Sequence, residues 1–378
     1  MITLIISGLT LVFCLYYGYL VLYLRKGWKL IEPHRIDNAI SVKTHVSVVI
    51  AARNEEQHIA EVIEAILKQD YPASLFELIV VDDHSTDRTS DIVSSYTDYG
   101  VKLIRLNMQE PLNSYKKKAI SEAIAQANGE LIVATDADCL MGINWLKCIV
   151  SLYEQSGYKL ISSPVVYHKE GNFFERLQTL EFLYLIGLGA ATIGLKRPST
   201  CNGANLAYRR DVFYELDGFK GIDDLASGDD ELFLHKVAQR YPTAVGFCKA
   251  QDAIVYTTAK RNLGDFITQR RRWASKSTKY KDGKVVAMGV SIWLFNVLIL
   301  LSGVLSPFFQ MCGYVLVGVL CIKILVEWLF LLPLTQFAHK RTLLGLLPLL
   351  SVLHVFYIIY IGVAGNTGKY HWKGRFVR

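Results

Sequence analysis

The sequence predicts an α/β domain with a doubly wound, mostly parallel sheet, accompanied by one N-terminal and two to three C-terminal transmembrane helices. Three observations lead to this prediction. In the middle of the chain, short apolar runs alternate with helical patterns, which is typical of a parallel sheet with helices on both faces. Polar clusters follow three of those runs, where ligands of such sheets bind. The hydrophobic residues, 52% of 378, are concentrated at the two ends of the chain.

The N-terminal end predicts a membrane anchor over residues 1–26. Residues 2–23 carry no charge, and Arg25, Lys26 and Lys29 follow them. About 20 apolar residues are enough to span a bilayer. The segment has neither the basic start nor the cleavage site of a secretory signal. Because basic residues beside a span stay in the cytoplasm, we expect residue 1 outside and the following domain inside.

Charge and cysteine content narrow the class of protein. The net charge is +7, but Lys and Arg gather beside apolar spans and in one short motif, not along a stripe with interleaved aromatic residues. We therefore expect no nucleic-acid partner. The seven cysteines show no metal-ligand spacing, so we expect free thiols in a reducing compartment.

The middle of the chain predicts four strands and three helices in its first half, one of them a short helix between residue 87 and the third strand. The strands are expected over Val46–Ala52, Phe76–Val81, Val101–Leu106 and Leu131–Ala134. Asn54 is predicted to cap a helix with the apolar face Ile59, Val62, Ile63, Ile66 and Leu67. Another helix is expected over Lys116–Ala127, ending before Gly129, with inward-facing residues Ala119, Ile120, Ala123, Ile124 and Ala127.

The fourth predicted strand ends in two carboxylates, Asp136 and Asp138, separated by one small residue. Paired oxygen ligands at the open end of a parallel sheet suit Mg²⁺ or Mn²⁺, which complete their shells with water and phosphate oxygens. The alternative is that the two aspartates only cap a turn. The chain contains no dinucleotide fingerprint, phosphate loop or H-E-x-x-H motif, so a ligand that brings a metal and phosphates fits best.

An ordered set of motifs resembles family 2 glycosyltransferases with the GT-A fold. The set covers roughly residues 46–280 and is specific as a whole, although each motif is weak alone. Membrane-bound members similar to ceramide glucosyltransferases and polysaccharide synthases share its last motif. The motifs are Val48-Val-Ile-Ala-Ala-Arg-Asn-Glu55, Val80-Val-Asp-Asp-His-Ser-Thr-Asp87, Ala134-Thr-Asp-Ala-Asp138, Cys201-Asn-Gly-Ala-Asn-Leu-Ala-Tyr-Arg209, Ser227-Gly-Asp-Asp-Glu-Leu232 and Gln269-Arg-Arg-Arg-Trp273.

The resemblance implies a nucleotide-sugar site at the strand ends. Glu55 and one of the neighbouring acids Asp82 and Asp83 would hold the uridine, and Asp136 and Asp138 the metal, Mg²⁺ or Mn²⁺, with the diphosphate. The implied binding residues are Ala52, Arg53, Glu55, Asp82, Asp83, Lys117, Asp136, Ala137 and Asn205. For the run at residues 116–118 a solvated helix start is the alternative to a phosphate contact. For Asn205 the alternative is a plain connecting turn.

The resemblance also implies the groups on the acceptor side. Inverting sugar transfer needs a carboxylate base, for which Asp229 and Asp230 are the candidates, because Gly228 stands where relatives have Glu. Counting back from Leu232 favours Asp229. The alternative is that these acids only favour a helix N-terminus. In the last motif, arginine contacts to diphosphate and tryptophan stacking under a sugar would involve Gln269, Arg272 and Trp273. A patch that binds anionic lipid is the alternative.

Two further segments are expected at the membrane. Residues 173–195 predict an interfacial helix that brings a lipid acceptor to the site, with a buried core helix as the alternative. Spans are expected over residues 285–307, 309–333 and 343–364. In the second of these, Lys323 and Glu327 lie one turn apart and can pair. Three spans would leave the basic tail outside, against the positive-inside tendency, so a re-entrant last stretch containing Pro348 is also possible.

The sequence therefore predicts a membrane-bound, metal-dependent, inverting glycosyltransferase. It would move a sugar from a nucleotide sugar, UDP-linked, to a lipid or glycan acceptor at the cytoplasmic face, as in a bacterial inner membrane. The predicted segments are an anchor at 1–26, a catalytic domain at 44–282, a transmembrane block at 283–366 and a basic tail at 367–378. The alternatives are a processive polysaccharide synthase and a catalytically inactive membrane scaffold.

Overall fold

The computed structural model describes residues 1–37, 42–107, 114–225, 227–276 and 283–365, together with the backbone of 370–372 and 375–377. It separates into two compact units. The helical unit comprises residues 1–28, 170–187 and 260–370, and the sheet unit comprises residues 29–169, 188–259 and 371–378. Residues 170–187 and 260–276, which we predicted within the catalytic domain, thus group with the membrane helices.

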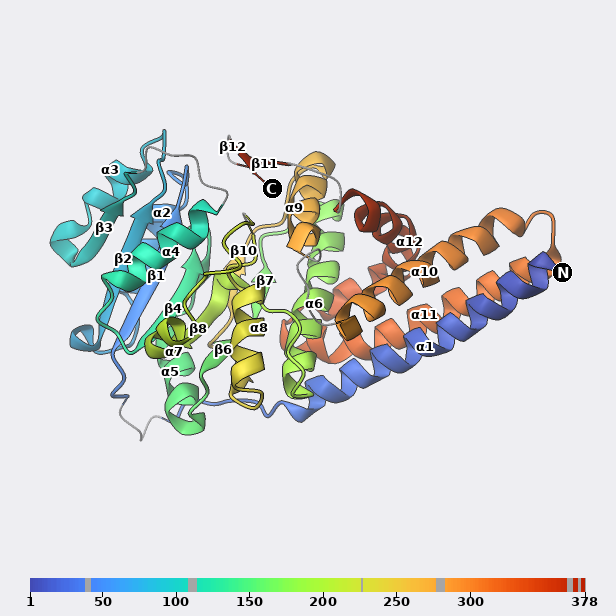
Figure 1. Cartoon of the computed structure of the whole chain (residues 1–378), viewed down its shortest axis with the longest axis horizontal. Coiled ribbons are helices and arrows are strands. Elements are labelled where there is room, and N and C mark those ends of the chain that lie inside the picture. Colours follow the sequence, from blue (N-terminus) through green and yellow to red (C-terminus); the bar gives the residue numbers. More distant parts are fainter. Residues whose placement is uncertain are drawn as a thin grey trace. The chain divides into compact units, whose positions relative to one another are not determined.

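The sheet unit is built on a seven-stranded sheet with the strand order β3-β2-β1-β4-β8-β6-β9 (Figure 1). The four strands predicted from the sequence are confirmed and run parallel: β1 (Val46–Ala52), β2 (Phe76–Asp82), β3 (Val101–Arg105) and β4 (Leu131–Asp136). Antiparallel β8 (Leu206–Arg209) joins β4 to β6 (Leu160–Ser162), and β9 (Val245–Phe247) lies parallel to β6. A second sheet contains β5 (Leu140–Met141), β10 (Val255–Thr257) and β7 (Val165–Tyr167).

Helices connect the strands as the hydrophobic spacing predicts. The predicted apolar face of α2 (Ile59–Leu67) is buried at Ile59, Val62, Ile63 and Ile66. Helix α4 (Tyr115–Ala125) buries the predicted residues Ala119, Ile120, Ala123 and Ile124 and packs on β1 and β2. The unit also contains α3 (Thr89–Ser94), α5 (Trp145–Ser156), α7 (Arg210–Glu215), α8 (Glu231–Arg240) and the short 3-10 helices η1 (Ala73–Leu75), η2 (Thr97–Tyr99) and η3 (Gly203–Asn205).

Of two details predicted at the helix ends, one differs from the structure and one is confirmed. The prediction that Asn54 caps α2 was wrong, because the cap position belongs to His58. Asn54 instead has a φ of +52° and accepts a hydrogen bond from Thr86 N at 2.8 Å, which connects the segments after β1 and β2. Gly129 lies beyond the end of α4, and a Cβ atom there would lie 2.4 Å from Ser47 N. A side chain at residue 129 would therefore prevent the approach of the β4 segment to β1.

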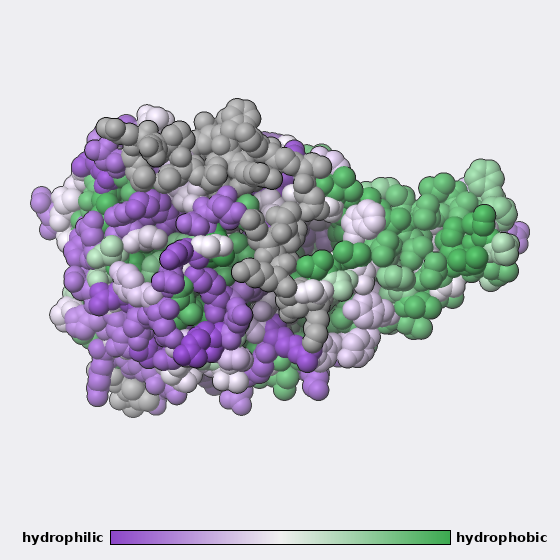
Figure 2. Space-filling model, viewed as in Figure 1, coloured by the Kyte–Doolittle hydropathy of each residue, from purple (hydrophilic) through white to green (hydrophobic). Residues whose placement is uncertain are grey.

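Among the described residues, five helices are long and apolar enough to cross a membrane: α1 (Ile2–Leu30), α6 (Phe173–Gly194), α10 (Gly283–Leu305), α11 (Gln310–Phe337) and the stretch Arg341–Ala364. The last stretch consists of the 3-10 helix η5 (Arg341–Leu346) and α12 (Leu347–Ala364). Pro348 lies in the first turn of α12, where a missing N–H breaks no helical hydrogen bond. Hydrophobic side chains cover the surface of α1, α10 and α11 (Figure 2).

Helix α6 is the exception among these helices, because most of its apolar stretch is buried within the protein. Four polar residues made this segment look too polar for a span. Glu175, Gln178 and Glu181 are less than 10% exposed, whereas Arg176 is exposed. Within the helical unit Gln178 exchanges hydrogen bonds with the backbone of Lys260. This burial favours the core-helix alternative over the predicted interfacial helix.

The predicted pairing of Lys323 with Glu327 is present at 2.6 Å inside α11, with both side chains buried. The Glu327 carboxylate also accepts hydrogen bonds from Tyr17 of α1 at 2.6 Å and Ser351 of α12 at 2.5 Å. A carboxylate buried without partners in an apolar bundle destabilises the fold. The arrangement of the helices that brings these donors to Glu327 is therefore favoured over arrangements that do not. One charged pair therefore ties three membrane helices together.

Part of the predicted basic tail lies outside the described residues, namely 367–369, 373, 374 and 378. The described backbone of the tail forms a two-stranded sheet of β11 (Tyr370–Trp372) and β12 (Arg375–Val377).

Candidate active site

The candidate site lies at one edge of the main sheet, where β1, β2 and β4 end. The parallel register pairs Ala51 of β1 with Asp136 of β4, and Ala52 of β1 with Asp82 of β2. Three polar segments that are far apart in the sequence are therefore brought to one edge. This arrangement is the one predicted from the strand ends.

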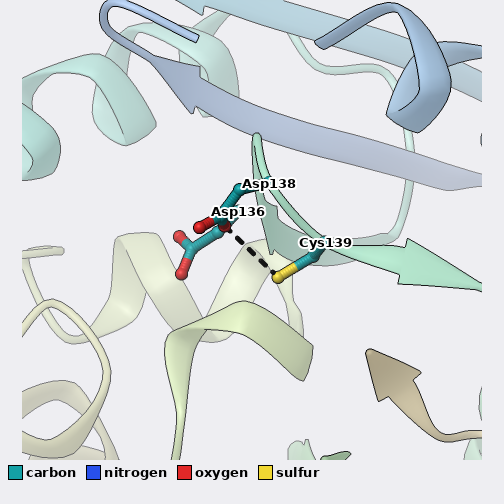
Figure 3. Close-up of side chains that lie close together, drawn as sticks. All are labelled: Asp136, Asp138 and Cys139. Carbon is teal, nitrogen blue, oxygen red and sulfur yellow. Dashed lines mark hydrogen bonds between the residues drawn. The ribbon is translucent and has the colours of Figure 1, made fainter. Parts of the chain in front are cut away.

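The D-A-D pair after β4 offers two carboxylates to a common point (Figure 3). Oxygen atoms of Asp136 and Asp138 lie with the sulfur of Cys139 within 4.8 Å of one another. The Cys139 thiol donates to Asp138 Oδ1 at 3.6 Å, and burial, together with the two neighbouring carboxylates, raises the pKa of this thiol well above its ordinary value. The three side chains thus offer two carboxylates beside this thiol. This donor set fits Mg²⁺ or Mn²⁺, which prefer oxygen ligands.

The three consecutive lysines at the start of α4 lie in three different environments. Lys116 Nζ lies 2.7 Å from Asp136 Oδ1 and 3.2 Å from Asp229 Oδ2. Burial opposes the charge of Lys116, but the neighbouring carboxylates outweigh it and raise the pKa of Lys116 above its usual range. Lys118 pairs with Glu122 at 2.6 Å on the partly exposed side of the helix, as the solvated-helix alternative predicts.

Lys117 was predicted to bind the nucleotide sugar, and the structure gives it another partner. Its side chain is 1% exposed and donates to the carbonyl oxygens of Leu225 at 2.6 Å and Ser227 at 2.7 Å. Burial lowers the pKa of Lys117, although neighbouring aspartates oppose that change. Lys117 therefore holds the loop before α8, and Lys116 is the lysine that reaches the carboxylates. One feature of the sequence pointed to Lys116. Family 2 glycosyltransferases often have a Gly-Lys pair at this place, and Lys116 stands where the lysine of that pair would be, after Tyr115.

The segment after β1 is held against the segment after β2 by Arg53. Its guanidinium donates to the carbonyl oxygens of Asp83 at 2.8 Å and His84 at 2.9 Å. The backbone N–H of Glu55 donates to Thr89 Oγ1 at 2.8 Å, which leaves its carboxylate at the partly exposed edge. Arg53 and Glu55 thus shape this edge from the first strand, next to buried Ala52.

Asp82 and Asp83, at the end of β2, are 6% and 2% exposed. Asp82 Oδ1 accepts the N–H of Ser85 at 3.2 Å, which closes the turn after the strand. Asp83 Oδ1 lies 3.0 Å from His84 Nδ1, and the ring of His84 meets the ring of Tyr115 edge-on at 6.0 Å. The two aspartates therefore have different local partners, although both lie at the predicted uridine site.

Asn205 was predicted to contact the nucleotide sugar, and in the structure its side chain has partners in the core. The side chain is fully buried and donates to the carbonyl oxygens of Pro164 at 2.8 Å and Ala253 at 2.7 Å. Its amide oxygen accepts the Trp145 indole N–H at 3.0 Å. Asn205 therefore connects three segments of the core, and a buried amide with these partners has little capacity left for a ligand.

The structure distinguishes the two candidate bases. Asp230 caps α8, since its Oδ1 accepts the N–H of Glu231 at 2.7 Å and its Oδ2 accepts the N–H of Gly203 at 3.0 Å. Asp229 instead directs Oδ2 toward Lys116. Gly228, where relatives have Glu, has a φ of +87°, a left-handed conformation that favours glycine. Ala226, in the same loop, lies outside the described residues.

The last predicted motif lies on α9 (Leu263–Ser275), in the helical unit. Gln269, Arg272 and Trp273 are partly exposed. Their spacing of three and four residues places them on one face of the helix. The intervening Arg270 is 2% exposed and faces the interior of the unit.

Residues 47–217, somewhat less than half of the chain, match the family model described as glycosyl transferase family 2. The chain is 30% identical over 240 residues to a probable glycosyltransferase YdaM of Bacillus subtilis, covering 61% of this chain and 54% of that protein. It is 30% identical over 138 residues to beta-monoglucosyldiacylglycerol synthase of Nostoc, covering 36% of this chain and 29% of that protein. The chain thus spans about half or less of the length of these curated relatives.

Among solved structures, the chain is similar to the mannosyltransferase PcManGT of Pyrobaculum calidifontis in complex with GDP-mannose and Mn²⁺. The TM-score is 0.60 at 18% identity, and the match covers 94% of this chain and 98% of that one. At this identity the likeness concerns the fold. The chain therefore has a GT-A-like α/β fold with a mostly parallel central sheet, and its residues 47–217 carry the sequence pattern of glycosyl transferase family 2.

Proposed function

We propose that this protein is a membrane-bound, metal-dependent, inverting glycosyltransferase of family 2. It transfers a sugar from a nucleotide sugar, UDP-linked, to a lipid or glycan acceptor at the cytoplasmic face of a membrane. The observation that carries the proposal is the convergence on one sheet edge of the D-A-D carboxylates with Lys116 and Asp229.

The donor side of the proposed site consists of the residues after β1, β2 and β4. Glu55 and one of Asp82 and Asp83 bind the uridine, and Asp136 and Asp138 hold the divalent ion. When bound, the ion neutralises charge on the diphosphate and so makes it a better leaving group. Lys116 adds a second positive charge beside Asp136, where it balances the carboxylates and is placed to attract phosphate oxygens.

The resemblance assigns acceptor-side roles to Asp229 and, separately, to residues of the α9 motif. Asp229 takes the proton of an acceptor hydroxyl while the hydroxyl oxygen forms a bond to the anomeric carbon of the sugar. The bond from that carbon to the diphosphate oxygen breaks, and the electron pair leaves with UDP, which inverts the anomeric centre. Arg272 stabilises the departing diphosphate, and Gln269 and Trp273 position the acceptor.

A lipid acceptor is favoured by two observations. Five helices are long and apolar enough to cross a membrane, and a curated relative is named as a synthase of a glucosylated diacylglycerol. A lipid acceptor would share the membrane with the enzyme, and a single transfer would suffice. A processive synthase is the second candidate, since the Q-x-x-R-W pattern does not determine how many sugars are added.

The test is UDP release by the full-length protein purified in detergent. UDP-sugars are screened one at a time with a lipid extract as acceptor, and the products are sized by mass spectrometry. We expect release with one donor, dependence on Mg²⁺ or Mn²⁺, and a product carrying a single sugar. A polymeric product would indicate the processive alternative. No release with any UDP- or GDP-sugar, together with no nucleotide binding, would support an inactive scaffold.

A further inference from the structure

Arg270 lies between the predicted contact residues of the α9 motif, but its side chain points into the helical unit and is 2% exposed. Its Nε donates to Glu181 Oε1 at 3.1 Å, and its Nη2 donates to the other carboxylate oxygen of Glu181. Glu181, on α6, is 4% exposed and also accepts a hydrogen bond from Tyr357 at 3.3 Å. A guanidinium that meets a carboxylate with two donors is fixed in both position and plane.

The same guanidinium contacts both ends of the motif. Its Nη1 donates to Gln269 Oε1 at 2.6 Å. Its central carbon lies 4.2 Å from the centroid of the Trp273 ring and 4.5 Å from that of Phe266, so the cation is in contact with two aromatic rings. A cation over an aromatic ring is attracted to it, more strongly when desolvated. The residue next to Glu181, Phe182, has its ring 5.9 Å from that of Trp273.

We propose that Glu181 and Arg270 form a positioning pair for the acceptor site. This inference rests on the proposed function and adds to it two residues that contact neither substrate. Glu181 fixes the plane of Arg270, and Arg270 in turn fixes the amide of Gln269 and the ring of Trp273. No motif in the sequence marks Glu181, which lies about 90 residues before the residues it orients.

The competing explanation is an ordinary ion pair that only holds α6 against α9. A buried ion pair contributes little net stability, because desolvation offsets the attraction between the charges. The Arg270 guanidinium also contacts Gln269 and Trp273 of the motif. An ion pair that only held α6 against α9 would not require these two contacts. The two explanations differ in the kinetics that they predict for a folded variant that keeps the charge of Arg270 but loses its planar guanidinium. A positioning pair predicts a lower kcat/KM for the acceptor, and an ordinary ion pair predicts no change.

The test compares Arg270→Lys and Glu181→Gln with Lys340→Gln. The last variant breaks the Lys340–Glu170 ion pair, which lies in the same unit at 2.7 Å in the wild type and includes no residue of α9. Lysine keeps the charge of Arg270 but loses its planar fork. We expect both pair variants to bind UDP as the wild type does, and to lower kcat/KM for the acceptor on the order of 10- to 100-fold, since small misplacements of positioning groups have effects of that size. Lys340→Gln should retain the wild-type kcat/KM.

A second readout follows Trp273 itself. The fluorescence of Trp273 is obtained in each background as the difference between the protein and its Trp273→Phe counterpart. Both pair variants should change that difference spectrum, and Lys340→Gln should not. Unchanged kcat/KM and an unchanged difference spectrum in folded Arg270→Lys would overturn the inference. If the wild type transfers no sugar, the proposed function fails, and the Trp273 spectrum still decides whether Glu181 and Arg270 position the ring.

Discussion

The ammonium of Lys116 lies 2.7 Å from the carboxylate of Asp136, the first aspartate of the D-A-D pair. The same nitrogen lies 3.2 Å from Asp229, the candidate base. One lysine on α4 thus connects the end of β4 with the loop that precedes α8. A cation between two carboxylates lowers their mutual repulsion, and it also lies next to the position where a divalent ion would bind.

The first prediction concerns this lysine. In Lys116→Met the positive charge beside Asp136 is lost, so divalent ions should bind several-fold more tightly, because the site then has one cation fewer to repel them. Sugar transfer should fall, because the diphosphate loses a positive partner. Mn²⁺ binding followed by electron paramagnetic resonance checks the first part, and Lys118→Met is the matched control. Weaker Mn²⁺ binding in Lys116→Met would contradict the expected repulsion.

The second prediction concerns the ion itself. Asp138→Asn removes a charged oxygen ligand but keeps the size of the side chain, so it should abolish transfer and weaken the metal-dependent part of UDP binding. The melting temperature should remain close to that of the wild type. UDP binding measured with and without Mn²⁺ separates these effects. Full wild-type activity in excess chelator would show that no metal takes part.

Sequence reasoning predicted which polar segments meet at one sheet edge, because these segments end or follow parallel strands, and the ends of parallel strands meet at one edge. The contacts of the individual side chains depended on tertiary packing, which the sequence pattern does not reveal. Asn205 lies in a turn motif, yet its amide is enclosed by Pro164, Ala253 and Trp145. Three consecutive lysines on a helix point about 100° apart, so only Lys116 can face the carboxylates while Lys117 is buried.

For the membrane helices too, the sequence pattern predicted some features, and others depended on tertiary packing. Apolar length was enough to predict α1, α10, α11 and α12, and a spacing of four residues was enough to predict the Lys323–Glu327 pair. The contributions of α1 and α12 to that pair could not be predicted. Tyr17 and Ser351 approach Glu327 from positions more than 300 residues apart along the chain, through tertiary contacts alone.

The third prediction tests that buried cluster. Glu327→Leu alone leaves the Lys323 ammonium buried without its carboxylate, which typically costs about 3–5 kcal/mol of unfolding free energy. The double variant Lys323→Met with Glu327→Leu removes both charges and should recover much of that loss. Unfolding in detergent of the two variants measures the difference. A double variant less stable than Glu327→Leu would mean that Lys323 is stabilised by other groups.

The fourth prediction concerns Arg272 on α9. Lysine at this position keeps the charge but not the two parallel donors of the guanidinium, so Arg272→Lys should cost about 1–3 kcal/mol in transition-state binding. Values of kcat/KM for the donor, measured in detergent without anionic lipid, report this loss. Wild-type kinetics under those conditions, with a defect only in anionic vesicles, would indicate a lipid-binding patch instead.

The last prediction is the identity of the base. A general base typically contributes ~10²–10⁴-fold to the rate and must reach the acceptor hydroxyl. Asp230 uses one carboxylate oxygen on the N–H of Glu231 and the other on the N–H of Gly203, so its contacts are those of a helix cap. The Asp229 carboxylate instead pairs with the Lys116 ammonium at 3.2 Å, which also contacts Asp136, so Asp229 is not committed to a helix cap.

Asp229→Asn should therefore remove transfer while UDP binding stays as in the wild type, because the donor is held by residues after β1, β2 and β4. Asp230→Asn should lower the melting temperature, since an amide replaces an acceptor oxygen at the cap, but it should retain a sizeable fraction of kcat. Turnover, UDP affinity and thermal unfolding of the two variants decide the assignment. If Asp230→Asn is inactive at full stability and Asp229→Asn is active, the base is the residue next along the chain, and the cap contacts of Asp230 must open during the reaction.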